Sequence, residues 1–83
     1  PSAARVAVVD DEAPVRVALG RLLRLAGYEV DTFESGAAFL ASLVTVHPAC
    51  AIVDVHMPSL SGLELQARLR VSRDRLPLIL ITA

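Results

Sequence analysis

The chain has 83 residues, of which 54% are apolar, and a net charge of −1, so it can form one domain at most. Its apolar residues occur in runs much shorter than the roughly 20 residues of a membrane-spanning helix, which argues against a membrane protein. The eight basic residues are dispersed along the sequence, which argues against a direct interface with nucleic acid or an anionic membrane.

The N-terminal third predicts a strand, a helix and a second strand. Residues 5–9 form a β-branched apolar run that stops at two acids, as expected of a strand buried on both faces. Pro14 suits a first helical turn, and the helix of about four turns that follows would end at Gly27. Its apolar residues at helical spacing are Val15, Ala18, Leu19, Leu22 and Ala26. Residues 28–33 alternate between two faces, which predicts a half-exposed edge strand.

The next segment predicts a second helix and a third strand. Ser35 can cap a helix that ends before Pro48 and carries a weaker apolar stripe, made of Ala38, Phe39, Ala41, Leu43 and Val46. Residues 50–53 form another buried strand, which Asp54 closes. The loop residues 57–62 follow, and His47 is expected to lie solvated in the preceding loop.

The last segment predicts a third helix and a fourth strand. Ser61 and Glu64 have the spacing of a capping box, and Leu65 and Leu69 lie on one face of the helix that they open. Residues 77–82 form the fourth strand. Without a neighbour this strand would be an exposed apolar edge, so we expect more chain to follow.

Alternating strands and helices with short connections predict an α/β fold with a parallel sheet and helices on both faces. The expected class is the flavodoxin-like doubly wound sheet, with strand order 2-1-3-4-5 in an intact domain. Residues 1–83 would then supply strands one to four and helices one to three, the N-terminal part of one domain.

Three acids follow the ends of two predicted strands. Asp10 and Asp11 end the first strand and Asp54 ends the third, and these ends meet at one edge if the strands are neighbours. Clustered carboxylates repel one another and need a cation, and an all-oxygen site with room for water suits Mg²⁺ better than Ca²⁺ or Zn²⁺. Capping of the first helix is an equally good account of Asp10 and Asp11 alone, but it does not explain Asp54.

Together these motifs resemble the bacterial response-regulator receiver domains, which share the fold of the chemotaxis response regulator. The likeness runs from Arg5 to Ala83 and rests on an ordered set of motifs: Val8-Val9-Asp10-Asp11-Glu12, Asp54-Val55-His56-Met57-Pro58, Gly62 and Ile81-Thr82-Ala83.

The resemblance implies a role for each site residue. Asp54 would be the phosphoacceptor that takes a phosphoryl group from a sensor histidine kinase. Asp10, Asp11, Asp54 and the backbone carbonyl of His56 would hold Mg²⁺. Thr82 would be the switch hydroxyl that bonds a phosphoryl oxygen. The lysine that the family places after its fifth strand would lie beyond Ala83.

The resemblance also implies a signalling domain rather than an enzyme, one that takes part only in its own phosphorylation and dephosphorylation. It allows for a homodimer and for regulation of transcription through an output domain outside this chain, of the LuxR-type helix-turn-helix class, which alone would contact nucleic acid. The single cysteine and the lack of a leader sequence favour the cytoplasm.

Two alternatives stay open. A pseudo-receiver would bind partners without phosphorylation, although such domains tend to lose the acids that this chain has. A Mg²⁺-dependent phosphohydrolase of the haloacid-dehalogenase type would need an Asp-x-Asp motif after the first strand, whereas Asp10 and Asp11 are adjacent.

Overall fold

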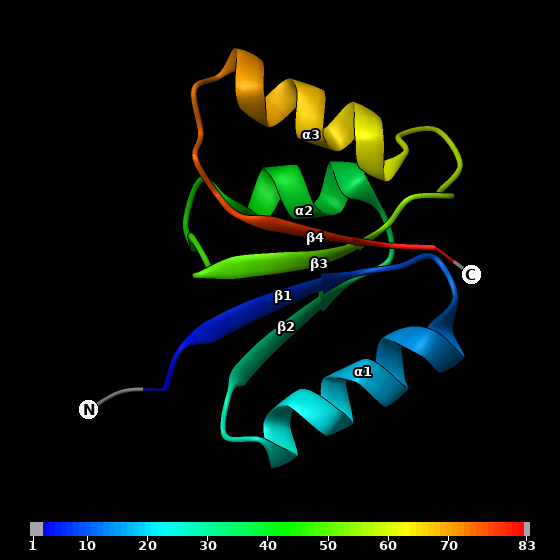
Figure 1. Ribbon diagram of the computed structural model, residues 1–83, viewed down its shortest axis with the longest axis vertical. Helices are drawn as coiled ribbons and strands as arrows, with labels where there is room; N and C mark the ends of the chain where they lie inside the picture. Colours follow the sequence, from blue (N-terminus) through cyan, green and yellow to red (C-terminus); the bar gives the residue numbers. More distant parts are fainter. Residues whose placement is uncertain (1–2, 83) are drawn as a thin grey trace.

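The computed structural model describes residues 3–82, which form a four-stranded parallel sheet between two layers of helices (Figure 1). The elements in chain order are β1 Arg5–Val9, α1 Ala13–Leu25, β2 Glu29–Phe33, α2 Gly36–Ser42, β3 Cys50–Asp54, α3 Gly62–Val71 and β4 Leu78–Ile81. Helix α1 covers one face of the sheet, and α2 and α3 cover the other (Figure 1). No helix of the described residues is both long enough and apolar enough to cross a membrane.

The strand order is β2-β1-β3-β4, which confirms the predicted order for these strands. The register pairs Val9 with Val53 and Asp54 with Ile81, so β1, β3 and β4 end at the same edge of the sheet. This edge holds the residues that follow β1 and close β3, which are the predicted acids.

The main core lies between the sheet and the α2–α3 layer. Phe39 of α2 and Leu65 of α3 are fully buried there against Val9 and Val53 of the central strands. Phe39 also contacts Phe33 edge to face, with 5.5 Å between the ring centroids. Leu69 is buried beside Leu65, as the predicted face of this helix requires, and the Ser61–Glu64 capping box is confirmed.

The prediction of which face of α1 is buried is wrong in part. Leu22 is 64% exposed, and Ala18 and Ala26 are exposed as well, whereas the buried residue of the helix is Gly20. A Cβ atom on Gly20 would make an ordinary contact with Thr32 Cγ2 of β2, at 3.6 Å, so this side of the helix lies against the strand. Helix α1 is apolar on several sides, and helical spacing alone therefore does not select the side that packs.

Helix α2 ends at Ser42, earlier than the predicted limit before Pro48. Ser42 Oγ donates to the Phe39 carbonyl, and Thr45 Oγ1 donates to the Ser42 carbonyl. Hydroxyl groups that bond backbone carbonyls in this way compete with continued helix. Of the predicted stripe, Phe39 is buried and Leu43 is half-buried, while the other members are exposed.

The edge strand β2 is the outermost strand, as predicted, and arginines protect it. Arg24 Nη2 donates to the Val30 carbonyl at 3.1 Å, and Arg5 bridges Glu29 and Asp31 at 2.9 and 2.7 Å. Charged side chains along an edge strand hinder pairing with another chain, so these contacts reduce the tendency to aggregate.

His47 lies exposed in the loop before β3, as the sequence predicted, and its side chain also contacts Asp74. Its Nε2 atom lies 3.0 Å from both carboxylate oxygens of Asp74 and, because an ionised carboxylate only accepts, the imidazole is the donor. The Asp74 carboxylate also accepts from the Leu76 amide at 2.9 Å. The pair therefore joins the loop before β3 to the loop before β4.

The His47–Asp74 contact predicts a pH-dependent share of stability. The hydrogen bond from His47 lowers the pKa of Asp74 below its usual 3.8, so this carboxylate stabilises the fold above that pH and loses the effect as pH falls through its folded pKa. We expect Asp74→Asn to lower the thermal midpoint at pH 6, and the difference from wild type to narrow below about pH 4. A difference that stays constant from pH 6 to pH 3 would contradict this assignment.

Candidate functional site

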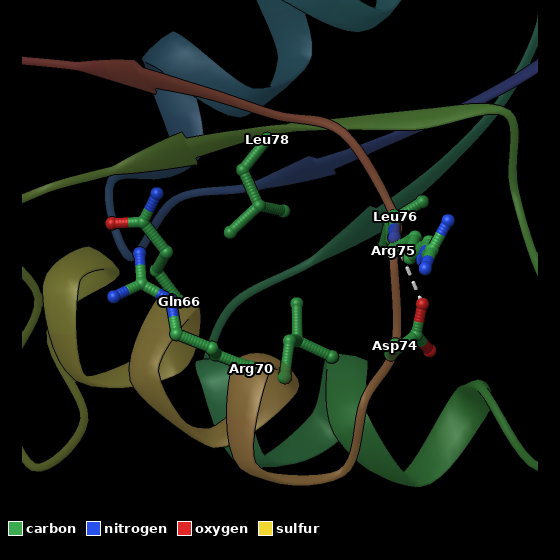
Figure 2. A pocket seen from close by; sticks show the side chains of 7 residues that line it. Gln66, Arg70, Asp74, Arg75, Leu76 and Leu78 are labelled. Carbon is green, nitrogen blue, oxygen red and sulfur yellow. Dashed lines mark hydrogen bonds between the residues drawn. The ribbon is translucent and has the colours of Figure 1, made fainter.

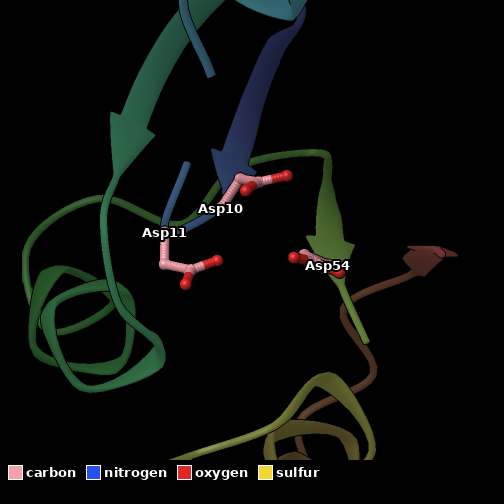
Figure 3. Close-up of side chains that lie close together, drawn as sticks. All are labelled: Asp10, Asp11 and Asp54. Atoms are coloured by element: carbon pink, nitrogen blue, oxygen red, sulfur yellow. The ribbon is translucent and has the colours of Figure 1, made fainter. Parts of the chain in front are cut away.

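Three carboxylates converge at the edge where the central strands end (Figure 3). Asp10 follows β1, Asp11 is the next residue of the loop, and Asp54 is the last residue of β3. Each offers one oxygen atom, and these three atoms all lie within 4.8 Å of one another. Asp10 and Asp54 are 3% and 8% exposed, whereas Asp11 is exposed to solvent.

The two buried carboxylates are held by the same local hydrogen bond. Asp10 Oδ1 accepts from the amide of Glu12 at 2.9 Å, and Asp54 Oδ1 accepts from the amide of His56 at 3.0 Å. In each residue Oδ2 has no hydrogen-bond donor among residues 3–82. Among the described residues, every side-chain oxygen that is fully enclosed has a hydrogen-bond partner. The two Oδ2 atoms have none, so they are not fully enclosed and retain access to solvent or to a ligand.

The donor set fits a hard divalent cation. Two unit charges 4 Å apart repel by about 4 kcal/mol at an effective dielectric constant of 20, so three ionised carboxylates at this spacing are mutually unfavourable. Every offered atom is a carboxylate oxygen, and the cluster contains no sulfur or imidazole ligand. Such a set suits Mg²⁺, which binds a few carboxylates and keeps several waters, and it disfavours zinc.

A hollow of about 210 Å³ opens beside the acids, lined by Asp10, Glu12, Val15, Asp54, Ile81 and Thr82. Thr82 follows β4 directly, is exposed, and lines the same hollow as Asp54. The structure thus brings the predicted switch residue beside the predicted phosphoacceptor. Its assigned role stays a prediction, and Ala83 lies outside the described residues.

His56 contributes to the site through its backbone. Its amide orients Asp54, and its side chain is exposed. The sequence resemblance assigns a metal-binding role to the carbonyl of the same residue, and that role stays a prediction.

Two residues at the site carry roles that the sequence did not reveal. Arg16 Nη1 donates to the backbone carbonyl of Asp10 at 2.8 Å. A Cβ atom on Gly62 would lie only 2.8 Å from the Asp54 carbonyl oxygen, so α3 begins against the backbone of β3. Gly62 stands out in the sequence as a loop glycine, but nothing in the local pattern links Arg16 to the acids.

A second hollow of about 200 Å³ lies between α3 and the start of β4, at the opposite end of the sheet (Figure 2). It is lined by Gln66, Leu69, Arg70, Asp74, Arg75, Leu76 and Leu78. Asp74 is the one acid of this lining, and it already bonds His47 and Leu76. Of these two hollows, the one at the strand ends combines several carboxylates that can accept a cation.

Comparison with known proteins identifies similar sequences and structures. The sequence model of the response regulator receiver domain family matches residues 6–83. The response regulator MprA of Mycobacterium sp. (strain KMS) is 39% identical over 79 residues, which are 95% of this chain and 34% of the relative. The chain therefore spans about a third of the length of the curated relatives that it matches.

Solved structures agree with these matches. The response regulator TrrA of Thermotoga maritima, in complex with Mg²⁺-BeF, superposes with a TM-score of 0.89 at 38% identity, covering 96% of this chain and 70% of that one. A chain from the complex of the histidine kinase ThkA with TrrA superposes with a TM-score of 0.87 at 38% identity, covering 96% and 69% of the two chains.

Proposed function

The chain belongs to the response regulator receiver domain family, and from this premise we propose that Asp54 is its phosphoacceptor. The observation that carries the proposal is the convergence of Asp10, Asp11 and Asp54, whose carboxylate oxygens lie within 4.8 Å of one another at the ends of β1 and β3. The phosphoryl donor is a sensor histidine kinase, in keeping with the described complex of TrrA with the histidine kinase ThkA.

In the proposed reaction, a carboxylate oxygen of Asp54 attacks the phosphorus of a phosphohistidine. The new O–P bond forms as the P–N bond breaks, and the kinase imidazole leaves with the bonding electron pair and takes up a proton. The His56 amide bonds Asp54 Oδ1, which leaves Oδ2 without a donor among residues 3–82 and makes it the proposed attacking atom. The product is an acyl phosphate on Asp54.

Asp10, Asp11, Asp54 and the carbonyl of His56 are the proposed ligands of Mg²⁺. When bound, the ion neutralises the negative charge that the carboxylates and the phosphoryl group would otherwise bring together. The described complex of TrrA with Mg²⁺-BeF supports this choice of ion. Thr82, on the surface of the same hollow, would donate its hydroxyl to a phosphoryl oxygen and so report phosphorylation to the surface of the domain.

The wider role is also a proposal. Residues 1–83 form the N-terminal part of a receiver domain, which further strands, helices and a lysine complete. The domain is a cytoplasmic signalling module that acts only in its own phosphorylation and dephosphorylation, with a homodimer as one assembly. Its output is regulation of transcription through a separate DNA-binding domain, for which we propose the LuxR type.

Intact-protein mass spectrometry tests the proposed chemistry and its dependence on metal. The protein that contains this chain is incubated with acetyl phosphate and Mg²⁺, and we expect a mass increase of one phosphoryl group. The adduct should be removed by hydroxylamine, as an acyl phosphate is, and EDTA should prevent its formation because the crowded carboxylates then repel the incoming anion.

The same measurement separates the alternatives. No added mass in the presence of Mg²⁺ would favour a pseudo-receiver and reject the proposal. If the adduct forms equally well in EDTA, the proposed metal site is wrong and phosphorylation does not depend on Mg²⁺.

A further inference from the structure

Asp10 is fixed at three separate atoms by three parts of the chain. Its amide donates to the Phe33 carbonyl at the end of β2 at 3.0 Å. Its Oδ1 atom accepts from the Glu12 amide, and its backbone carbonyl accepts from Arg16 Nη1 of α1 at 2.8 Å. The buried acid is therefore anchored to a strand, to its own loop and to a helix.

The bond from Arg16 satisfies a group that would otherwise have no partner. Among the described residues, no backbone amide donates to the Asp10 carbonyl, and Asp10 as a whole is only 3% exposed. A buried carbonyl without a donor is unfavourable, and a bond from a charged guanidinium is stronger than one from a neutral donor. Arg16 therefore supplies the hydrogen-bond donor to the peptide group between Asp10 and Asp11.

Asp11 depends on that peptide group for its position. Its side chain is exposed and forms no hydrogen bond to any residue from 3 to 82, in contrast to the two buried acids. Its carboxylate nevertheless lies within 4.8 Å of the oxygens of Asp10 and Asp54. Because no side-chain contact holds it there, the backbone that precedes it must do so.

We propose that Arg16 is a positioning residue of the metal site, which holds Asp11 in place through the carbonyl of Asp10. This inference rests on the proposed function, since it assigns to Arg16 the orientation of a carboxylate that would bind Mg²⁺. Arg16 itself does not touch the ion. Residues that orient a metal ligand without touching the metal typically weaken metal binding by about tenfold to a hundredfold when they are removed.

The test measures Mg²⁺ affinity and metal-free stability separately on the protein that contains this chain. Mg²⁺ alone is titrated by isothermal calorimetry, and the thermal midpoint is recorded in EDTA. Arg16→Met keeps the aliphatic stem and removes the donor, and we expect at least tenfold weaker Mg²⁺ binding. Arg16→Lys keeps one charged donor and should recover much of that loss.

A matched control lies on the same helix. Arg21 is exposed and its side chain bonds no described residue, so Arg21→Met removes an equal charge without touching the acids and should leave Mg²⁺ affinity within about twofold. A bulk charge effect would instead change both methionine variants alike, and that result would overturn the inference.

Each further outcome gives a decision. If Arg16→Met lowers only the thermal midpoint in EDTA while Mg²⁺ affinity stays unchanged, Arg16 has a structural role and the inference is wrong. If Arg16→Met does not fold, Arg16→Lys decides, because a folded lysine variant that binds Mg²⁺ at least tenfold more weakly than the wild type would deny that a charged donor at this position orients the site. If the wild-type protein binds no Mg²⁺, the proposed metal site itself fails, a result distinct from any difference between variants.

Discussion

Asp54→Asn is expected to abolish the acid-stable, hydroxylamine-sensitive phosphoryl adduct while the protein remains folded. The amide has the shape of the carboxylate and can still accept from the His56 amide, so the loop after β3 keeps its conformation. The variant lacks the ionised oxygen that attacks phosphorus. Mass spectrometry after incubation with acetyl phosphate and Mg²⁺ gives the result directly.

For the same variant we expect no loss of stability when metal is absent. Asp54 is 8% exposed and lies beside two other carboxylates, so its charge opposes folding when no cation is bound. We therefore expect the thermal midpoint of Asp54→Asn in EDTA to equal or exceed that of wild type. We also expect Mg²⁺ to raise the thermal midpoint of the variant less than it raises that of the wild type. A phosphoryl adduct that survives the substitution would show that another residue is the acceptor.

Gly62→Ala is expected to destabilise the domain by about 2 kcal/mol or more and to slow phosphorylation of Asp54. The added Cβ atom would lie 2.8 Å from the Asp54 carbonyl oxygen and 3.1 Å from Val55 Cα, both of which are backbone atoms of β3 and its exit. Neither can move without displacing the strand end that carries the acceptor. A displacement of this kind near 1 Å can reduce the rate of transfer by roughly a hundredfold.

Gly36→Ala provides a matched control for the crowding at Gly62. Its Cβ atom would also lie 2.8 Å from a neighbour, but that neighbour is Cδ2 of Leu60, and the next is Cγ of the same side chain at 3.2 Å, so the crowding involves a side chain and no backbone atom. Its loss of stability should be smaller, about 1 kcal/mol, and the phosphorylation rate should not change. Chemical denaturation and the rate of adduct formation measure both quantities, and equal effects of the two substitutions would contradict the assignment.

Local sequence patterns predicted the strands and the acids well. Buried strands such as 5–9 and 50–53 are continuous β-branched or apolar runs, and each is followed by an acid that water or a cation must solvate. The capping box at Ser61 and Glu64 is equally local, because its two hydrogen bonds join residues three positions apart. These features depend on neighbours in the sequence, and so they can be recognised there.

Features that depend on contacts between distant residues were not predicted. The face of α1 that packs contains the buried Gly20, which lies near Thr32 of β2, although the helix offers several apolar sides. The His47–Asp74 pair joins two loops 27 positions apart, and its members look like ordinary solvated residues in the sequence. In both cases the energetically relevant neighbour is defined only when the chain has folded.

The sequence by itself determined the order of the elements and the identity of the three acids, and its motifs carried the resemblance to the family. It did so because hydrophobic periodicity and strand-ending carboxylates are properties of short segments. The tertiary structure decided how those acids are held: the parallel register brings Asp10 and Asp54 to one edge, and Arg16 fixes the carbonyl of Asp10 from α1. Hydrogen-bond geometry of a few ångströms depends on the packing of helix against sheet, and no local pattern encodes that packing.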